Sequence, residues 1–358
     1  MINFFKNKYK LINSIYIFFL FFLIFFIKFS TISALANSFK IVDLEISKPY
    51  DKKFNKEKVI DTAFEKAFQE LILRITTLKV EELHNLTNLK NIYSLIESFS
   101  IVDEKFIDNK YTSKFEVEFN KRNLFRYLES KNIFPSIPNE RDLLLIPILI
   151  DNKKNQLQLF SENIFYKNWN EFNEKYYLLN YILPNEDIED IKLIRKNINN
   201  IEQYNFNEIV KKYAIKDYII LILFKNENNF NALMKINLNN KLIISNKKFN
   251  WNEDDTVENI IKDLKIEFET YWKKLNIINV SIKLPITLSV KSKDYKLIQE
   301  LDKKLYELDL VSDYYIDTFS NEEIVYKIIY NSTPNKFINE FANSSIILNT
   351  NNSIWRVE

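Results

Sequence analysis

The stretch DLLLIPILID, Asp142 to Asp151, constrains the fold more than any other part of the sequence. Between its two aspartates lie eight uncharged residues, a length that suits a strand better than a helix. An apolar run without alternation is typical of a strand that is buried on both faces, as in parallel or mixed sheets covered by helices. We therefore expect a buried strand here, with helices packed on both sides of its sheet.

The sequence that follows continues this pattern. Helix signals surround Trp169, YYLLNYILP (176–184) predicts a second buried strand, NEDIEDIKLI (185–194) begins a helix, and FNEIVKKYAIKDYIILILF (206–224) predicts a helix and then a strand. Alternating helices and buried strands indicate a mixed or parallel sheet. A hairpin is expected around Asn239-Asn240, and Asp255 with Glu258 resembles a capping box for a helix that ends near Trp272.

The sequence before this region predicts a smaller unit. FKIVDLEIS (39–47) suits a strand, and apolar pairs recur every four residues from Val59 to Ile72, which indicates an amphipathic helix. FSIVDEKFI (99–107) and YTSKFEVEF (111–119) predict a hairpin that turns at Asn109-Lys110, followed by a helix capped by Asn120. The prolines of FPSIPNE (134–140) mark a boundary.

The last part of the chain alternates strands and helices again. We expect strands over 284–290, 311–319 and 322–330, helices over 294–308 and 334–341, and a final hairpin through Ile346 and Trp355. The expected fold class is an α+β and α/β multi-domain protein with mixed sheets and helices packed on them, ending in a small α+β sandwich. The expected domains are 37–141, 142–275 and 276–358, after an N-terminal segment over 1–36.

That N-terminal segment has the features of a secretory signal. Three lysines precede thirteen uncharged residues, Ile15 to Ile27, and Ala34 and Ala36 are the small residues that a signal peptidase requires. Because a spanning helix needs about 20 apolar residues, we expect cleavage after Ala36. The alternative is an inner-membrane anchor formed by residues 11–27. Either way the remainder leaves the cytoplasm, and we expect a periplasmic protein that contacts membrane only through this segment.

Composition excludes several classes of function. The chain has no Cys, which removes disulfides, lipid attachment and thiol catalysis, and a single histidine, His84, removes most zinc and haem sites. It also has no Gly, so phosphate loops, dinucleotide fingerprints and the G-x-S-x-G elbow cannot exist in their usual form. We expect no cofactor, a structural and not a catalytic role for His84, and asparagine at left-handed turns.

The charge of the chain argues against nucleic acid as a partner. Residues 1–36 carry four lysines and no acid, so the remainder has 46 basic against 48 acidic residues. A chain so close to neutral after residue 36 lacks the positive electrostatic field expected of a nucleic-acid binder.

Two acidic clusters are the candidates for metal or acid–base chemistry. One comprises Glu186, Asp187, Glu189 and Asp190, and the other Glu253, Asp254 and Asp255. Carboxylates suit hard cations such as Ca²⁺, which makes Glu186, Asp187 and Asp190 weak metal candidates, but the spacing is not that of a calcium loop. Both clusters lie where helices are expected to begin, and acids there cap free amides. We favour capping, with no catalytic residue assigned.

A group of aromatic residues offers a second candidate site. Asn163, Trp169 and Phe172 could line a groove that serves as a binding surface, since aromatic side chains with a polar tip are common in such sites. The alternative is that they are core residues, which we favour in a chain so rich in aromatics.

The order of five segments resembles the DUF2066 family of secreted bacterial proteins, in particular its alphaproteobacterial members. The segments are AFEKAFQELILRIT (63–76), DLLLIPILID (142–151), NIFYKNW (163–169), YLLNYILPNEDIEDI (177–191) and KYAIKDYIILILF (212–224). The resemblance covers nearly all of the chain after residue 36 and implies a periplasmic location without catalytic residues to carry over. Where the family tends to have Gly, this chain has Thr77 and Asn132.

Two functions fit these observations. The first is a non-enzymatic binding or scaffolding module with a protein partner in the cell envelope, because domains of this kind offer sheet edges and faces to partners. The alternative is a carboxylate-dependent envelope hydrolase acting on a glycan or a similar substrate, which needs two carboxylates converging in one cleft.

Overall fold

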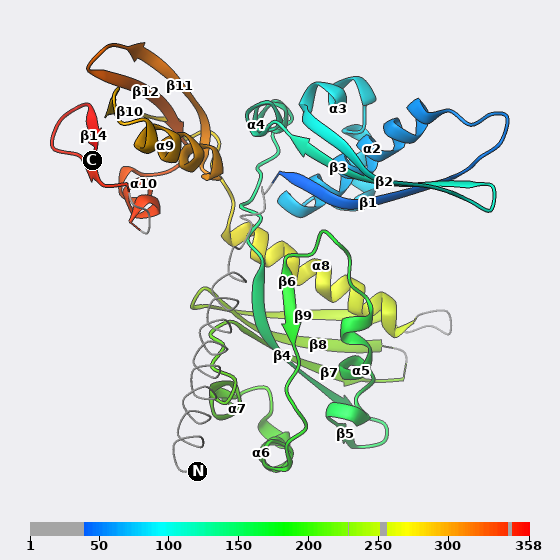
Figure 1. Cartoon of the computed structure of the whole chain (residues 1–358). Helices are drawn as coiled ribbons and strands as arrows, with labels where there is room; N and C mark the ends of the chain where they lie inside the picture. The colour runs from blue at the N-terminus through cyan, green and yellow to red at the C-terminus, as the bar shows by residue number, and fades with distance from the viewer. Residues whose placement is uncertain (1–38, 228, 251–255, 343–345) are drawn as a thin grey trace, which may run out of the picture.

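The structure, a computed structural model, describes residues 39–227, 229–250, 256–342 and 346–358. The expected signal with Ala34 and Ala36, and the second acidic cluster, Glu253 to Asp255, lie outside the described residues. The predicted fold class is confirmed, because helices pack on three separate sheets (Figure 1). Within the described part of the chain, no helix combines the length and the apolar character needed to cross a membrane.

The first sheet has three antiparallel strands in the order β1-β3-β2, with α2 packed on one face. The elements of this block are β1 (Lys40–Pro49), α2 (Lys56–Ile75), η1 (Val80–Asn85), α3 (Leu89–Leu95), β2 (Ile96–Ile107), β3 (Lys110–Phe119) and α4 (Lys121–Ser130). Asn120 caps α4 as predicted, by accepting the amide of Asn123. The hairpin turn falls on Asp108 and Asn109, one residue earlier than predicted, because these two residues have the positive φ that the turn requires.

The second sheet is built around the apolar strand that contains residues 142–151. Its order is β5-β4-β7-β8-β9, with β6 pairing in parallel with β4. Its elements are β4 (Arg141–Asp151), β5 (Gln156–Gln158), η2 (Phe160–Glu162), α5 (Ile164–Asn168), η3 (Trp169–Glu171), β6 (Leu179–Ile182), α6 (Ile188–Lys196), η4 (Ile198–Asn200), α7 (Asn207–Lys211), β7 (Tyr218–Lys225), β8 (Asn229–Leu238), β9 (Lys241–Asn250) and α8 (Val257–Leu275).

Strand β4 is buried on both faces, as predicted. Leu143, Leu145 and Leu149 join one apolar cluster with residues of α5 and α8, whereas Ile146 and Ile148 join another with residues of α6 and α7. Because alternate side chains of a strand point to opposite faces, a continuous apolar run serves both clusters.

Two details of this block differ from the prediction. Strand β6 is only four residues long and alternates between buried and exposed positions, because one face of it is not covered. Helix α8 is capped one residue later than predicted, by Thr256, whose side chain accepts the amide of Asn259. Thr256 suits this position because its hydroxyl reaches the third amide of the helix.

The third sheet has the order β11-β12-β10-β14-β13. Its elements are β10 (Leu284–Lys291), α9 (Tyr295–Glu307), β11 (Val311–Phe319), β12 (Glu323–Tyr330), α10 (Pro334–Phe341), β13 (Leu348–Asn349) and β14 (Trp355–Val357). Asp294 caps α9, and Pro334 occupies the first turn of α10, where its missing amide hydrogen does no harm. The predicted strands, helices and final hairpin of this region are confirmed.

The central block is inserted between the other two. The segments that enter and leave it pair with each other: the amide of Ile278 donates to the carbonyl of Pro135 at 2.8 Å, and that of Ile137 to Asn276 at 2.9 Å. Buried residues from the first and last blocks, Phe39 to Leu128 and Ile278 to Val357, belong to one apolar cluster. The predicted division into three domains stays a prediction, but two of the three blocks share a core.

Polar contacts reinforce this shared core at α4. The Lys121 amine donates to the carbonyl of Leu308 at 2.6 Å, and burial lowers its pKa to about 8. Arg122 forms an ion pair with Asp313 at 2.8 Å. The first and last blocks are therefore joined by bonds that link distant parts of the sequence.

Asparagine does replace glycine at the left-handed positions. Nine described residues have a positive φ, and seven of them are Asn or Asp, including Asn132, Asn239 and Asn240. The two exceptions are Phe160 at 45° and Ala214 at 52°. Alanine has no side-chain group that offsets the strain of this conformation.

Candidate binding cleft and a row of buried charges

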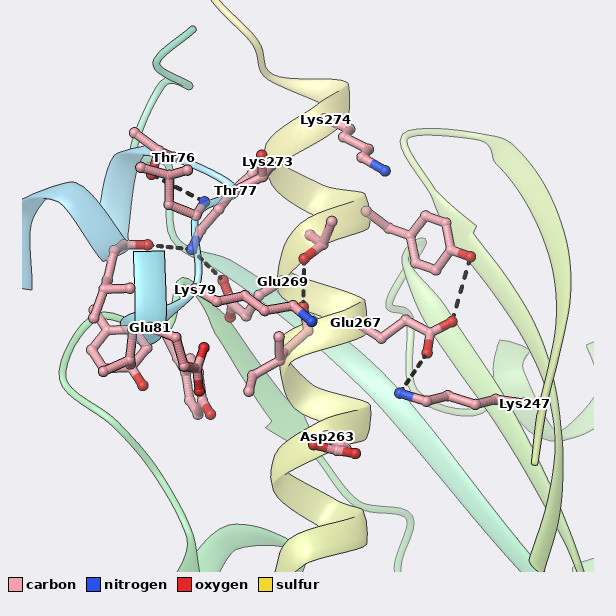
Figure 2. A pocket seen from close by; sticks show the side chains of 18 residues that line it. Thr76, Thr77, Lys79, Glu81, Lys247, Asp263, Glu267, Glu269, Lys273 and Lys274 are labelled. Carbon is pink, nitrogen blue, oxygen red and sulfur yellow. Dashed lines mark hydrogen bonds and ion pairs between the residues drawn. The ribbon is translucent and has the colours of Figure 1, made fainter. Parts of the chain in front are cut away.

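A cleft of about 510 Å³ lies where the first block meets helix α8 (Figure 2). The end of α2 and the loop to η1 form one wall, β9 and α8 form the other, and the segment before β6 contributes two tyrosines. Its lining residues are Leu73, Thr76, Thr77, Leu78, Lys79, Val80, Glu81, Tyr176, Tyr177, Lys247, Asp263, Ile266, Glu267, Glu269, Thr270, Tyr271, Lys273 and Lys274.

Three ionisable residues of α8 are buried beside or within this cleft. Lys265, Glu269 and Lys273 are 0%, 2% and 5% exposed. They are spaced four residues apart, so they lie one above another on a single face of the helix. This row adjoins the apolar stripe formed by Leu264, Phe268 and Trp272. Burying three charges is costly unless each is bonded, and the contacts of the row show how the cost is offset.

Glu269 binds the backbone at the start of β6. Its Oε1 accepts the amides of Leu178 and Leu179, both at 2.8 Å. Burial raises the pKa of this carboxyl, and the nearby Lys273 amine and the two amides oppose the rise. Glu269 thus fixes the edge of the central sheet to α8.

Lys273 connects the same helix to the first block. Its amine donates to the carbonyl of Leu73, near the end of α2, at 2.5 Å, and lies 4.0 Å from the Glu269 carboxylate. Burial lowers the pKa of Lys273 to about 8, opposed by Glu269. Since Leu73 belongs to the last turn of α2, whose carbonyls lack intrahelical partners, the amine satisfies a group that would otherwise be unpaired.

Lys265, at the other end of the row, binds the segment that follows η3. Its amine donates to the carbonyl of Phe172 at 2.6 Å and to Oδ1 of Asn173 at 2.5 Å. It also lies 5.3–6.0 Å from the ring centres of three aromatic residues, a geometry that suits a cation–π contact. These are Trp169, Tyr177 and Tyr181. Burial lowers the pKa of Lys265 to about 8.

The rim of the cleft carries charges of both signs. Among the described residues, Lys79, Lys274, Glu81 and Asp263 form no ion pair, and all four are exposed. Figure 2 shows that Lys79 extends across the cleft toward α8. On the opposite wall the Lys247 amine lies 3.3 Å from the Glu267 carboxylate, which also accepts a bond from the hydroxyl of Tyr271 at 3.5 Å.

This arrangement suits binding better than catalysis. The carboxylate with the perturbed pKa, Glu269, already uses Oε1 for two backbone amides, and Glu81, the acid on the opposite wall of the cleft, is exposed on its rim. Across the described ranges, no group of three or more Asp, Glu or His side chains is placed to hold a metal ion.

The first acidic cluster caps a helix and surrounds a lysine. Asp187 caps α6 by accepting the amide of Glu189, as predicted. The Lys212 amine lies 2.7 Å from both Asp187 and Asp190. Hydrogen bonding to Lys212 lowers the pKa of Asp187, and the two acids raise the pKa of Lys212. A lysine amine therefore occupies the position between the carboxylates where a cation would sit.

The remaining candidates also take structural positions. Glu186 is exposed and accepts a bond from the Ser161 hydroxyl at 3.3 Å, so the three weak metal candidates converge on no common cation site. His84 is exposed, and its Nδ1 donates to the carbonyl of Glu81 within the same turn. The interpretation of these residues as structural fits their contacts.

Trp169 does not form a binding surface. It is fully buried and packs against Tyr181 and Phe268, because the apolar cluster between α5 and α8 needs a large side chain there. Phe172 is partly buried against the same cluster. Asn163 is buried as well: it caps α5 and donates to the carbonyl of Pro147 at 3.1 Å. The alternative of a core role is the one that the contacts support.

The sequence contains a signal for the buried row. In LKIEFETYWKKL (264–275), Lys265, Glu269 and Lys273 each follow an apolar residue that recurs every four positions. Side chains next to an apolar stripe lie at the edge of the buried face of a helix. Charged residues repeated at that edge indicate bonded partners in a neighbouring element.

Searches against protein-family models and against curated proteins found no match for this chain.

Proposed function

We propose that the chain is a non-enzymatic binding module of the cell envelope and that the cleft beside α8 holds its ligand. The ligand that fits is a polar segment or small molecule with both positive and negative groups. One observation carries this proposal: the rim has two lysines and two acids without ion pairs in the described part of the chain, Lys79, Lys274, Glu81 and Asp263. A ligand of both signs would pair with them.

The walls of the cleft are fixed before a ligand arrives. Glu269 holds the segment of the two tyrosines, and Lys273 holds the end of α2. A cleft with preset walls loses less conformational entropy on binding than a flexible one. Its volume of about 510 Å³ lies within the usual range of ligand sites.

The proposed location in the envelope is supported by the sequence. The lysines, the apolar run and Ala34 with Ala36 suit a signal cleaved after Ala36, and the resemblance to DUF2066 proteins also favours the periplasm. Retention by residues 11–27 as an inner-membrane anchor would leave the cleft on the same side of the membrane. A hydrolase is the less favoured alternative: it would need Glu81 and an acid of α8 as its two carboxylates, and the buried acid of α8, Glu269, already binds two backbone amides.

Site-specific photo-crosslinking in the native envelope tests this proposal. A photo-reactive residue at Thr77, which is exposed on the cleft wall, is compared with one at Ser130, which is exposed at the end of α4. We expect a defined adduct at Thr77 only. The paired changes Lys79→Glu with Lys274→Glu, and Glu81→Lys with Asp263→Lys, should each abolish it.

The two paired variants distinguish the classes of ligand. A purely anionic ligand would be lost with the first pair and retained or strengthened with the second, which would contradict a ligand of both signs. Equal adducts at Thr77 and Ser130 would remove the cleft from consideration. Unfolding measurements on each variant establish that the loss is not a loss of fold, since all four side chains are exposed.

A further inference from the structure

A second surface stands at the opposite end of α2 from the cleft. Here the β2–β3 hairpin ends beside residues 50–55, which connect β1 to α2 (Figure 1). The cleft contacts the last turn of α2 and this surface adjoins its first turn, so the 20 residues of the helix place them about 30 Å apart. We call the surface formed by residues 48–54 and 105–111 the tip.

The tip exposes aromatic and aliphatic side chains. Tyr50 is 50% exposed, Phe106 is 59% exposed and Ile107 is 61% exposed. The Tyr50 ring packs on Phe106 at 5.0 Å between ring centres and on Phe54 at 4.9 Å, and these rings cover the buried Tyr111. The exposed rings are therefore held in place by a packed base, so they present a formed apolar surface and not loose side chains.

Lysines surround these rings. Four exposed lysines of the tip form no ion pair with any described residue: Lys48, Lys52, Lys53 and Lys110. The register of the sheet places Lys48 beside Tyr111, and Lys110 between Pro49 and Ile107. Basic and apolar groups thus occupy the same small surface.

The nearby acids are mostly committed to local bonds. Asp51 accepts the amide of Lys53 at 2.8 Å, Asp103 pairs with Lys105 at 2.7 Å, and Glu104 pairs with Lys56 at 2.6 Å and accepts the hydroxyl of Tyr111. Asp108 lies in the hairpin turn. The tip contains five lysines, Lys48, Lys52, Lys53, Lys105 and Lys110, against Asp51 and Asp108, so it carries a net positive charge although the chain after residue 36 is almost neutral.

We propose that the tip docks on an anionic phospholipid bilayer. Tyrosine and phenylalanine are suited to the boundary between headgroups and acyl chains, and lysines near an anionic membrane surface are attracted to it. A protein groove would need complementary acids and a shaped apolar recess, whereas a membrane accepts a protruding tip of this composition. This contact is separate from residues 1–36, and the cleft then points away from the membrane.

Vesicle flotation tests the proposal with the chain from Asn37 to Glu358, which contains every described element. We expect binding to phosphatidylglycerol–phosphatidylcholine vesicles, at least about tenfold weaker binding to pure phosphatidylcholine, and loss of binding in 1 M salt, where the screening length falls to about 3 Å. Lys52→Glu with Lys53→Glu should weaken binding at least about tenfold. Phe106→Ser with Ile107→Ser should weaken it at low salt.

Exposed residues far from the tip provide matched controls. Lys241→Glu with Lys248→Glu on β9 reverses two exposed lysines elsewhere, and Phe319→Ser on β11 removes an aromatic ring that is 72% exposed. Both should bind like the unaltered chain. Equal binding by the tip variants and the controls would overturn the proposal. A second contrary outcome has two parts: the chain binds heparin as tightly as vesicles, and Phe106→Ser with Ile107→Ser leaves vesicle binding unchanged. That outcome would identify a general polyanion contact. The Lys52 and Lys53 variant keeps the test valid if Phe106→Ser unfolds.

Discussion

Glu269 and Lys273 lie one turn apart on α8, 4.0 Å from carboxylate oxygen to amine nitrogen, yet each makes its shorter bond to the backbone of a different segment. Glu269 binds the amides at the start of β6 at 2.8 Å, and Lys273 binds the last turn of α2 at 2.5 Å. The pair therefore joins two blocks of the chain through one helix. Its energetic value lies in these backbone bonds as much as in the attraction between the two charges.

Replacing Lys273 should weaken this junction. Lys273→Met keeps the length of the side chain but removes the donor to Leu73 and the charge facing Glu269, so we expect the free energy of unfolding to fall by about 1–3 kcal/mol. Urea denaturation measures the change. Lys274→Met, at an exposed neighbouring position, is the control and should shift it by less than about 0.5 kcal/mol.

The difference in unfolding free energy between the unaltered chain and Lys273→Met should depend on pH. The pKa of Lys273 is about 8 in the folded chain against an ordinary 10.5, so between these values the unfolded chain binds the proton more tightly. The cost of burying the protonated amine is present in full below about pH 8 and is removed as the pH rises from 8 to 10.5. The unfolding free energy of the unaltered chain should rise relative to Lys273→Met from pH 8 to pH 10. Parallel curves would contradict this assignment.

Two substitutions of Glu269 separate the effect of its charge on stability from the effect of its hydrogen bonds. Glu269→Gln keeps an oxygen for the amides of Leu178 and Leu179, and we expect it to change the unfolding free energy by less than about 1 kcal/mol. Glu269→Ala leaves two buried amides without a partner and should cost at least about 2 kcal/mol. Hydrogen exchange at Leu178 and Leu179 provides a local readout: faster exchange in the alanine variant alone is the expected result.

Ala214 offers a stabilising change. Its φ of 52° strains a residue with a Cβ, so Ala214→Gly should raise the unfolding free energy by about 1 kcal/mol. Ala63→Gly, inside the buried face of α2, is the opposite control and should lower it by at least about 1 kcal/mol. A loss of stability at Ala214 would show that the side chain contributes packing that outweighs the strain.

The proposed signal makes a prediction about the mature chain. Protein isolated from the native envelope should begin at Asn37, and Ala36→Tyr should block cleavage because the peptidase site accepts only small side chains. N-terminal sequencing distinguishes the outcomes. A native chain that begins at Met1 would favour the membrane anchor.

Local chemistry explains which elements could be predicted from the sequence. The cap of α4 at Asn120 and the turn at Asn239-Asn240 depend on a few neighbouring residues, and their positions were predicted correctly. The double-sided burial of β4 followed from its composition. Strand β6 was predicted to be buried, but its apolar Ile182 is exposed.

Contacts between distant segments explain what could not be predicted. The roles of Glu269 and Lys273 depend on Leu178 and Leu73, and no sequence spacing joins these residues to α8. The position of Lys212 between Asp187 and Asp190 likewise arises only when α6 and the segment after α7 come together. The helix-capping interpretation of Asp187 was correct because a cap is a local feature.

The shared core of the first and last blocks sets the order in which parts of the chain can fold. Phe39 and Val357 contribute to the same apolar cluster, so the part that emerges first during synthesis cannot complete its packing until the final residues follow. Contacts of such long separation slow folding and leave apolar surface open in the meantime. A chain truncated after α8 would retain the central sheet but leave its first block half-covered, a ready target for proteases and holding chaperones.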